Sequence, residues 1–170
     1  MWCRFVDVNV RLATYEDLAA IEAVVRWSCS EAIGELVPES VVDAEIEARF
    51  RRPVLAEHIL SRRLVVCGDA EGHLEVVALV DDQSEFTELS TVVVPAHPSK
   101  SPDGRVLVAA LRSMGWTGPL VSGTALGHTV QERFHESAGF APGEVTVARL
   151  AGHDVFRRRW WLGPALSAAG

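Results

Sequence analysis

Two imidazoles and a carboxylate recur along one predicted helix of this 170-residue chain. His128, Glu132 and His135 stand at positions i, i+4 and i+7, so a helix over residues 127–137 would place them on one face. Such groups are common ligands of divalent metals. From the rise per residue, the first and last of the three would lie about 10 Å apart along the helix axis. One ion could reach only one end of this stripe, and we predict no metal site.

A carboxylate and a hydroxyl share one face of a predicted strand over residues 86–94. Side chains alternate across a strand, so Glu88 and Ser90 point to one side and Leu89 points to the other. A carboxylate that borders a cleft can accept a proton from a substrate, which is the task of a general base. A solvent-exposed carboxylate on a strand would give the same pattern, and the residues alone leave both interpretations open.

Several enzyme classes have no motif in this sequence. It contains no G-x-S-x-G nucleophile elbow, no Walker loop and no H-E-x-x-H pair. Its cysteines, Cys3, Cys29 and Cys67, lack C-x-x-C spacing, which is typical of isolated thiols in a reducing compartment. The first residues also lack the cationic and apolar regions of a secretion signal. We therefore expect a cytoplasmic protein.

Composition and charge limit the partners. The chain is 48% apolar and 23% charged, which is typical of a folded domain with a sizeable core. A formal charge of −7 argues against a broad nucleic-acid surface, and the one dense basic run, Arg157 to Arg159, suits a solvated strand end or a local anionic contact. No apolar run approaches the ~20 residues that cross a membrane. We expect one domain over residues 1–162, a tail over residues 163–170, and neither nucleic acid nor membrane as a partner.

The spacing of apolar residues predicts the elements that must position these groups. Helices are expected at residues 14–27, 39–52, 55–63, 106–114 and 127–137, with a break at Pro53. Strands are expected at residues 6–12, 64–67, 74–80, 86–94, 120–122, 145–150 and 155–162. Strand pairs punctuated by helices predict an α+β fold, with a mixed, mostly antiparallel sheet of about six to seven strands.

Three segments resemble motifs of the GNAT superfamily of acyl-CoA-dependent N-acyltransferases. Residues 8–21, VNVRLATYEDLAAI, are similar to the first strand and helix of that family, and residues 87–95, TELSTVVVP, to its fourth strand. Residues 128–140, HTVQERFHESAGF, resemble its helix pattern N-x-x-A-x-x-(apolar)-Y-x-x-x-G-F. The resemblance covers nearly the whole chain. It implies a GNAT-like domain whose fourth strand splays from the fifth to admit a cofactor.

The helix segment departs from the family pattern at the positions of its chemistry. His128 replaces the asparagine, Gln131 the alanine and His135 the tyrosine. The resemblance implies that Glu88 is the base, and it puts His135 in the place of the acid, where an imidazolium could protonate a departing thiolate. A helix-face histidine in a protein that has lost the transferase reaction is the alternative.

The connector before the next helix differs from the family's phosphate loop, [Q/R]-x-x-G-x-[G/A]. Alignment of the helix faces puts Gly104 on the last small position, Pro102 on the first glycine and Ser99 on the Gln/Arg. Pro102 has no N–H to give to a pyrophosphate, and Asp103 would place a carboxylate beside that anion. The alternative is that this segment only caps the helix, with Asp103 as an acid at its N-terminus.

The resemblance implies acetyl-CoA or another acyl-CoA as cofactor and a small amine as acyl acceptor. The residues that it attributes to cofactor binding lie on the fourth strand, the connector and the helix starts: Val92, Val93, Val94, Lys100, Gly104, Arg105 and His128. A repurposed biosynthetic enzyme, or a non-catalytic binding protein on the same fold, is the alternative function. The acids of residues 27–63 suit a cationic amine or solvated helices, and an aromatic terminal strand suits a homodimer.

Overall fold

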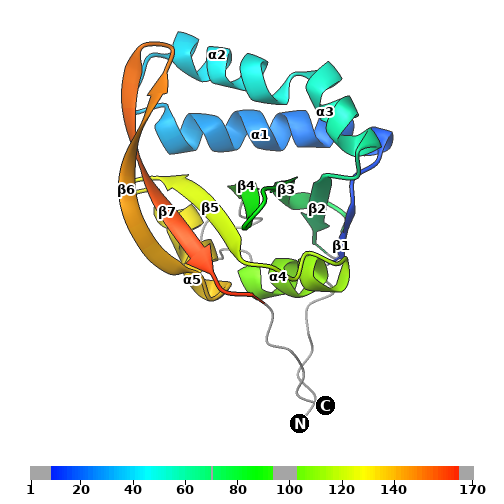
Figure 1. Ribbon diagram of the computed structural model, residues 1–170. Helices are drawn as coiled ribbons and strands as arrows, with labels where there is room; N and C mark the ends of the chain where they lie inside the picture. The colour runs from blue at the N-terminus through cyan, green and yellow to red at the C-terminus, as the bar shows by residue number, and fades with distance from the viewer. Residues whose placement is uncertain (1–8, 70, 94–102, 165–170) are drawn as a thin grey trace.

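A seven-stranded sheet forms the centre of the protein (Figure 1). The computed structural model describes residues 9–69, 71–93 and 103–164. The strands lie in the order β1-β2-β3-β4-β5-β7-β6, and the only parallel neighbours in these residues are β4 and β5. Their bounds are β1 Asn9–Leu12, β2 Leu64–Gly68, β3 Leu74–Asp82, β4 Thr87–Val93, β5 Leu120–Ala125, β6 Ala141–Leu150 and β7 His153–Leu162. The predicted α+β fold with a mostly antiparallel sheet is confirmed.

Helices cover both faces of this sheet (Figure 1). One face carries α1, α2 and α3, and the other carries α4 and α5. Their bounds are α1 Leu18–Ile33, α2 Glu39–Phe50, α3 Arg52–Leu60, α4 Gly104–Ser113 and α5 Thr129–Ser137, with a short 3-10 turn at Tyr15–Asp17 before α1. None of the helices in the described part of the chain combines the length and apolar character that a bilayer-spanning helix needs.

Some boundaries differ from the expected ones for identifiable reasons. Helix α1 continues past Trp27 because Ser28 and Ile33 extend its buried stripe. Pro53 does not interrupt a helix but lies in the first turn of α3, where its missing N–H leaves no hydrogen bond unmade. Strand β6 begins at Ala141 and contains a register shift, which the alternation in the sequence did not reveal.

Alternation along β4 divides the core into two layers. Leu89 packs beneath α4 and α5 with Leu107 and Phe134, while Val92 packs with Ile21 on the side of α1. Glu88 and Ser90 have the same strand parity as Val92, so they also face the α1 side. The strand that carries the candidate base is therefore fixed from both sides by buried apolar contacts.

Candidate active site

Strands β4 and β5 separate beside the predicted base. The register pairs Thr87 with Leu120, Glu88 with Val121 and Leu89 with Ser122, and no further pair joins the two strands within the described residues. At the last pair, Ser122 Oγ lies 2.8 Å from the Leu89 carbonyl oxygen. Both strands continue beyond this point. The splayed strands that the resemblance implied are present, and two strand edges with polar backbone groups border the opening.

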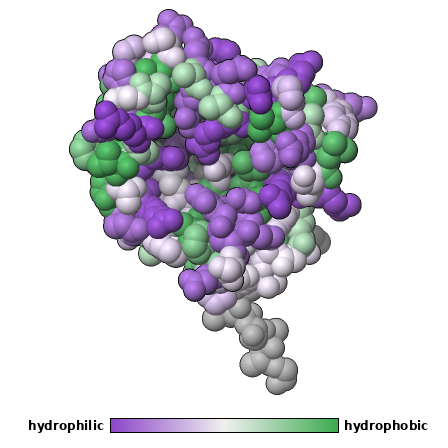
Figure 2. Space-filling view, turned by 45° about the horizontal axis from the view of Figure 1, so that its top comes forward, coloured by the Kyte–Doolittle hydropathy of each residue, from purple (hydrophilic) through white to green (hydrophobic). Residues whose placement is uncertain are grey.

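A pocket lies at this separation, between α1, α2, β4, β5 and β7. We call it the central pocket. Its apolar lining is Cys29, Ala32, Ile33, Phe50, Val92, Ala125, Leu150 and Val155, and its polar lining includes Glu45, Arg49, Ser90, Gln131 and Arg157. Seen with the α1–α3 side tilted forward, the surface has a recess near its middle with hydrophilic side chains along much of the rim (Figure 2). An apolar pocket with a few polar groups is typical of a small-molecule site.

Glu88 lines a second pocket that adjoins the central one. The two pockets share Arg49, Ser90, Gly123 and Arg157. The Glu88 side chain is exposed and belongs to the last strand pairs before β4 and β5 part. The structure thus places the predicted base within reach of a ligand at the strand opening.

His135 lies in the core, and we correct its expected role as an acid. The ring is 0% exposed and stacks on Trp160 at 5.4 Å between centroids. Its Nδ1 lies 2.7 Å from the Gln131 carbonyl oxygen and its Nε2 2.8 Å from Ser122 Oγ. Burial lowers the pKa of His135 to about 4. A neutral ring without exposed surface cannot hand a proton to a ligand, so this position supports the strand junction instead.

The other groups of the predicted helical stripe make separate local contacts. His128 caps α5, with its Nδ1 accepting a hydrogen bond from the Gln131 N–H (3.2 Å). Glu132 accepts one from the Gly127 N–H (3.2 Å). His128 also lines a surface pocket with residues of α1 and the β5–α5 loop, and that pocket has no residue in common with the Glu88 pocket. This surface pocket shares Ala32 with the central pocket, and the expected contact between His128 and a cofactor stays a prediction.

Protein groups satisfy the backbone donors at the start of α4. Asp103 caps the helix, accepting from the Arg105 N–H (3.0 Å), and it pairs with the Arg105 guanidinium (2.7 Å). The Gly104 N–H donates to Ser137 Oγ (3.0 Å), and the Val106 N–H donates to the Asp103 carbonyl (3.2 Å). The capping alternative for Asp103 is confirmed. The Arg105 guanidinium is paired with this carboxylate, and its expected role in phosphate binding stays a prediction.

Gly104 serves packing at this position. A Cβ atom there would lie 2.5 Å from both the Ala138 Cβ and the Phe134 carbonyl oxygen, so only glycine lets α4 approach α5 this closely. Its expected role as a phosphate-loop glycine stays a prediction.

The remaining predicted cofactor residues lie on or after β4. Val92 is 6% exposed and lines the central pocket. Val93 is the last residue of β4 and pairs with Val76 of β3. Val94 and Lys100 lie outside the described residues.

Two pocket residues, Arg49 and Arg157, were not among the predicted site residues, although Arg157 begins the basic run for which a local anionic contact was one interpretation. Arg157 could have been found from alternation, because it has the same strand parity as Val155, which is buried in the adjacent core. Arg49 belongs to the last turn of α2 and is brought to the pocket only by helix packing. No local pattern distinguishes it from the other charged residues of that helix.

Neither described cysteine has the properties of a nucleophile. Burial raises the pKa of Cys29 to about 11 and that of Cys67 to about 12, so both thiols stay protonated at neutral pH. Cys29 contributes only its apolar surface to the central pocket.

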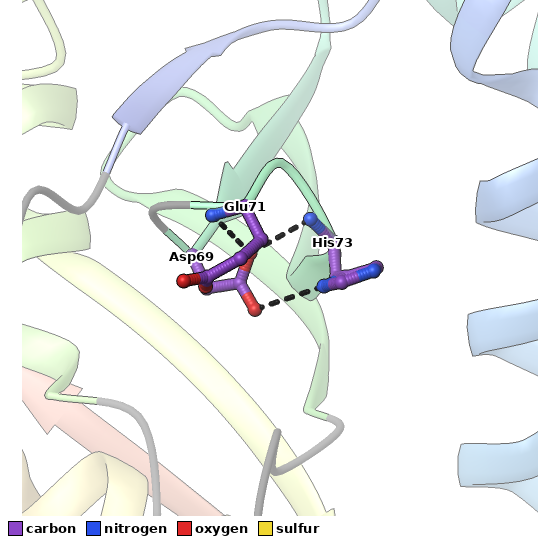
Figure 3. A group of neighbouring side chains, drawn as sticks. All are labelled: Asp69, Glu71 and His73. Atoms are coloured by element: carbon purple, nitrogen blue, oxygen red, sulfur yellow. Dashed lines mark hydrogen bonds and ion pairs between the residues drawn. The ribbon is translucent and has the colours of Figure 1, made fainter.

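A group of polar side chains shapes the turn between β2 and β3 (Figure 3). Asp69 Oδ1 accepts hydrogen bonds from the backbone N–H of Glu71 (3.0 Å) and of His73 (2.8 Å), and Oδ2 lies 3.2 Å from His73 Nδ1. Possible ligand atoms of these three residues lie within 4.8 Å of one another. Since the carboxylate is engaged in holding the turn, we attribute to it a structural role.

Comparisons with known proteins identify the fold. No protein-family model and no curated protein sequence matches the chain. The PaiA N-acetyltransferase of Thermoplasma acidophilum, solved with coenzyme A, is 17% identical and has a TM-score of 0.66 over 89% of this chain and 98% of its own. Vibrio cholerae spermidine N-acetyltransferase, solved with CoA and spermine, is 16% identical with a TM-score of 0.62 over 92% and 95%. Salmonella typhimurium yncA, solved with its cofactor acetyl-CoA, is 23% identical with a TM-score of 0.58 over 95% and 96%. The chain therefore has the fold of the GNAT superfamily, the family that its motifs resemble.

Proposed function

We propose that the protein transfers an acyl group from a CoA-type thioester to a small amine at the opening between β4 and β5. The separation of these strands beside Glu88 and the central pocket carries this proposal. Strand edges can bind an extended chain of amide groups through backbone hydrogen bonds, which suits a pantetheine arm. The thioester, when bound, supplies an activated acyl group. The structural neighbours solved with CoA or acetyl-CoA support the choice of donor.

The protein's own residues then divide the remaining work. Glu88 accepts the proton of the acceptor's ammonium group, directly or through a water molecule, which leaves the nitrogen able to attack the thioester carbon. As the C–N bond forms, the C–S bond breaks, and the leaving thiolate takes up, through water, the second proton that the nitrogen loses. The central pocket holds the rest of the acceptor. His135 acts as a positioning residue, because its Nε2 contacts the Ser122 hydroxyl at the point where β5 separates from β4.

The described residues can bind the pantetheine arm of a CoA-type donor, but they do not fit the diphosphate of CoA bound at the start of α4. The first backbone donors of that helix are engaged by Asp103 and Ser137, and the Asp103 carboxylate occupies the end of the helix dipole that favours anions. This observation favours a second candidate, in which the same fold binds a small molecule without using CoA in the usual way. The two candidates differ in whether any thioester reacts.

S-acetylpantetheine, which has the arm and the thioester but no diphosphate, is expected to replace acetyl-CoA with a kcat/KM within about tenfold. The reason is that α4 offers the diphosphate no unengaged donor among its first N–H groups. Amine-dependent thiol release measures both rates, and mass spectrometry of the acceptor confirms the product.

Asp103→Asn is the matched variant for this comparison, because it keeps a capping oxygen and removes the charge. It should lower the KM for acetyl-CoA and leave that for S-acetylpantetheine unchanged. A preference for acetyl-CoA of more than about 100-fold in the wild type would show that the diphosphate is bound after all. If neither donor releases thiol with any amine, the transferase proposal fails and the second candidate stands.

Two further expectations stay proposals. A homodimer could form through the β6–β7 hairpin, where Val145, Val147 and Phe156 expose apolar side chains. The free thiols of Cys29 and Cys67 suit the reducing conditions of the cytoplasm.

A further inference from the structure

Two guanidinium groups from distant parts of the chain line the central pocket. Arg49 comes from the last turn of α2 and Arg157 from the middle of β7. We infer that they bind a carboxylate of the acceptor, so that the acceptor is a small amino acid with an apolar side chain. This inference rests on the proposed transferase function and names the substrate class for the same site.

The two arginines differ in whether a carboxylate of the protein pairs with them. Arg49 pairs with Glu45 (2.9 Å) and donates to Ser90 Oγ (2.9 Å). Arg157 donates to the Gly123 carbonyl at 3.5 Å, the limit of a hydrogen bond, and within the described residues no carboxylate lies at ion-pair distance from it. A largely enclosed cation is costly when no carboxylate of the described residues pairs with it, and an anionic ligand would reduce that cost.

The electrostatics of Arg157 agree with this imbalance. Burial lowers the pKa of its guanidinium and the neighbouring charge of Arg49 lowers it further, while the carboxylates of Glu45 and Glu88 offset only part of this shift. Two like charges that face one space repel each other in the free protein. A carboxylate between them would accept charge-assisted hydrogen bonds from both, and the planar guanidinium fork matches its geometry.

The position of Glu88 indicates which carboxylate-bearing molecule fits. The Glu88 pocket shares both arginines with the central pocket, so an acceptor bound there by its carboxylate can have its amine in the same connected space as the base. The remaining wall includes Ile33, Phe50 and Val92, which suits an apolar side chain. An α-amino acid combines these three features in a small molecule.

A cationic acceptor fits less well. The acids of residues 27–63 do not gather in the central pocket, because Glu31 and Glu35 line the pocket near His128 and Glu47 lines a groove between α1 and α2. Only Glu45 lines the central pocket, and Arg49 already pairs with it. The solvated-helix interpretation therefore holds for most of these acids.

Titration of the protein with L-leucine and L-leucinamide, in the absence of any acyl donor, tests this inference. L-leucine at millimolar concentration should raise the unfolding temperature, and L-leucinamide should not. Arg157→Gln should weaken L-leucine binding about 10- to 100-fold, because charge-assisted hydrogen bonds are lost. Arg149→Gln is the matched control: it removes the same charge from a β6 side chain that is 75% exposed, and it should bind like the wild type.

Two further variants distinguish a ligand-binding role of Arg157 from a structural role. Arg157→Met should unfold at the same or a higher temperature, since it removes from an enclosed site a charge that no carboxylate of the described residues pairs with. Arg157→Lys keeps the charge but loses the fork, so it should fold normally and bind L-leucine more weakly. Equal binding of the acid and the amide, or unchanged L-leucine affinity in Arg157→Gln, would overturn the inference.

The same probes separate this inference from the proposed function. L-leucine binding without acyl transfer would support the carboxylate site and contradict the transferase. Transfer to isopentylamine, which lacks the carboxylate, as fast as to L-leucine would support the transferase and overturn the carboxylate site.

Discussion

Glu88→Gln is expected to lower kcat for acyl transfer by at least about 100-fold, with little change in the affinity for donor or acceptor. The amide has nearly the shape of the carboxylate and keeps its place on β4, but it cannot accept the ammonium proton. Steady-state thiol release with saturating donor measures the rate. Titration of each ligand measures the affinities separately.

The pH dependence of this variant gives a second readout. Raising the pH toward the pKa of the acceptor's amine supplies the neutral amine without a base, so the deficit of Glu88→Gln should shrink. Glu85→Gln is the matched control, because Glu85 is an exposed acid in the turn before β4 and should have the wild-type rate. An unaltered rate in Glu88→Gln would remove Glu88 from the mechanism.

Acidification from pH 6.5 to pH 4 is expected to cost about 3 kcal/mol of the free energy of unfolding at His135 alone. The ordinary pKa of 6.5 applies to the unfolded chain, and burial lowers the folded value to about 4. The unfolded state therefore takes up the proton first. The full contribution is present well above pH 6.5, is lost as the pH falls toward 4, and changes little more below that value. Urea unfolding at a series of pH values measures it.

His135→Gln tests the origin of this dependence. The variant should be less stable at neutral pH, because it loses the stack on Trp160, but its stability should fall less between pH 6.5 and pH 4. Burial also lowers the pKa of His128, so the comparison is best made in a His128→Gln background. Asp17 does not interfere, since the Arg11 guanidinium lowers its pKa from 3.8 to about 2 and its contribution is lost only in that lower range. The same pH slope with and without His135 would contradict this account.

The fold could be predicted because local patterns agreed with one another. Alternation in residues 86–94 placed Leu89 on one face and Glu88 with Ser90 on the other, which the two core layers confirm. The order of helices and strands along the chain then limited the possible strand orders in the sheet to a few.

The site was harder to predict because it depends on contacts between distant segments. The face of α5 that carries His135 is buried by Trp160, a residue that the sequence places on another strand near the end of the chain. Gly104 resembled a phosphate-binding residue, but its environment is decided by Ala138 of the neighbouring helix end. Arg49 and Arg157 meet only through the packing of α2 against the sheet.

Amide hydrogen exchange with and without saturating S-acetylpantetheine tests most directly whether the opening between β4 and β5 holds an acyl thioester. We expect slower exchange in both facing strand edges, at residues 90–93 of β4 and 123–125 of β5, where the register no longer joins the strands. The β2–β3 turn should be unaffected. Unchanged exchange in both strands at saturating S-acetylpantetheine and at saturating acetyl-CoA would contradict the proposal.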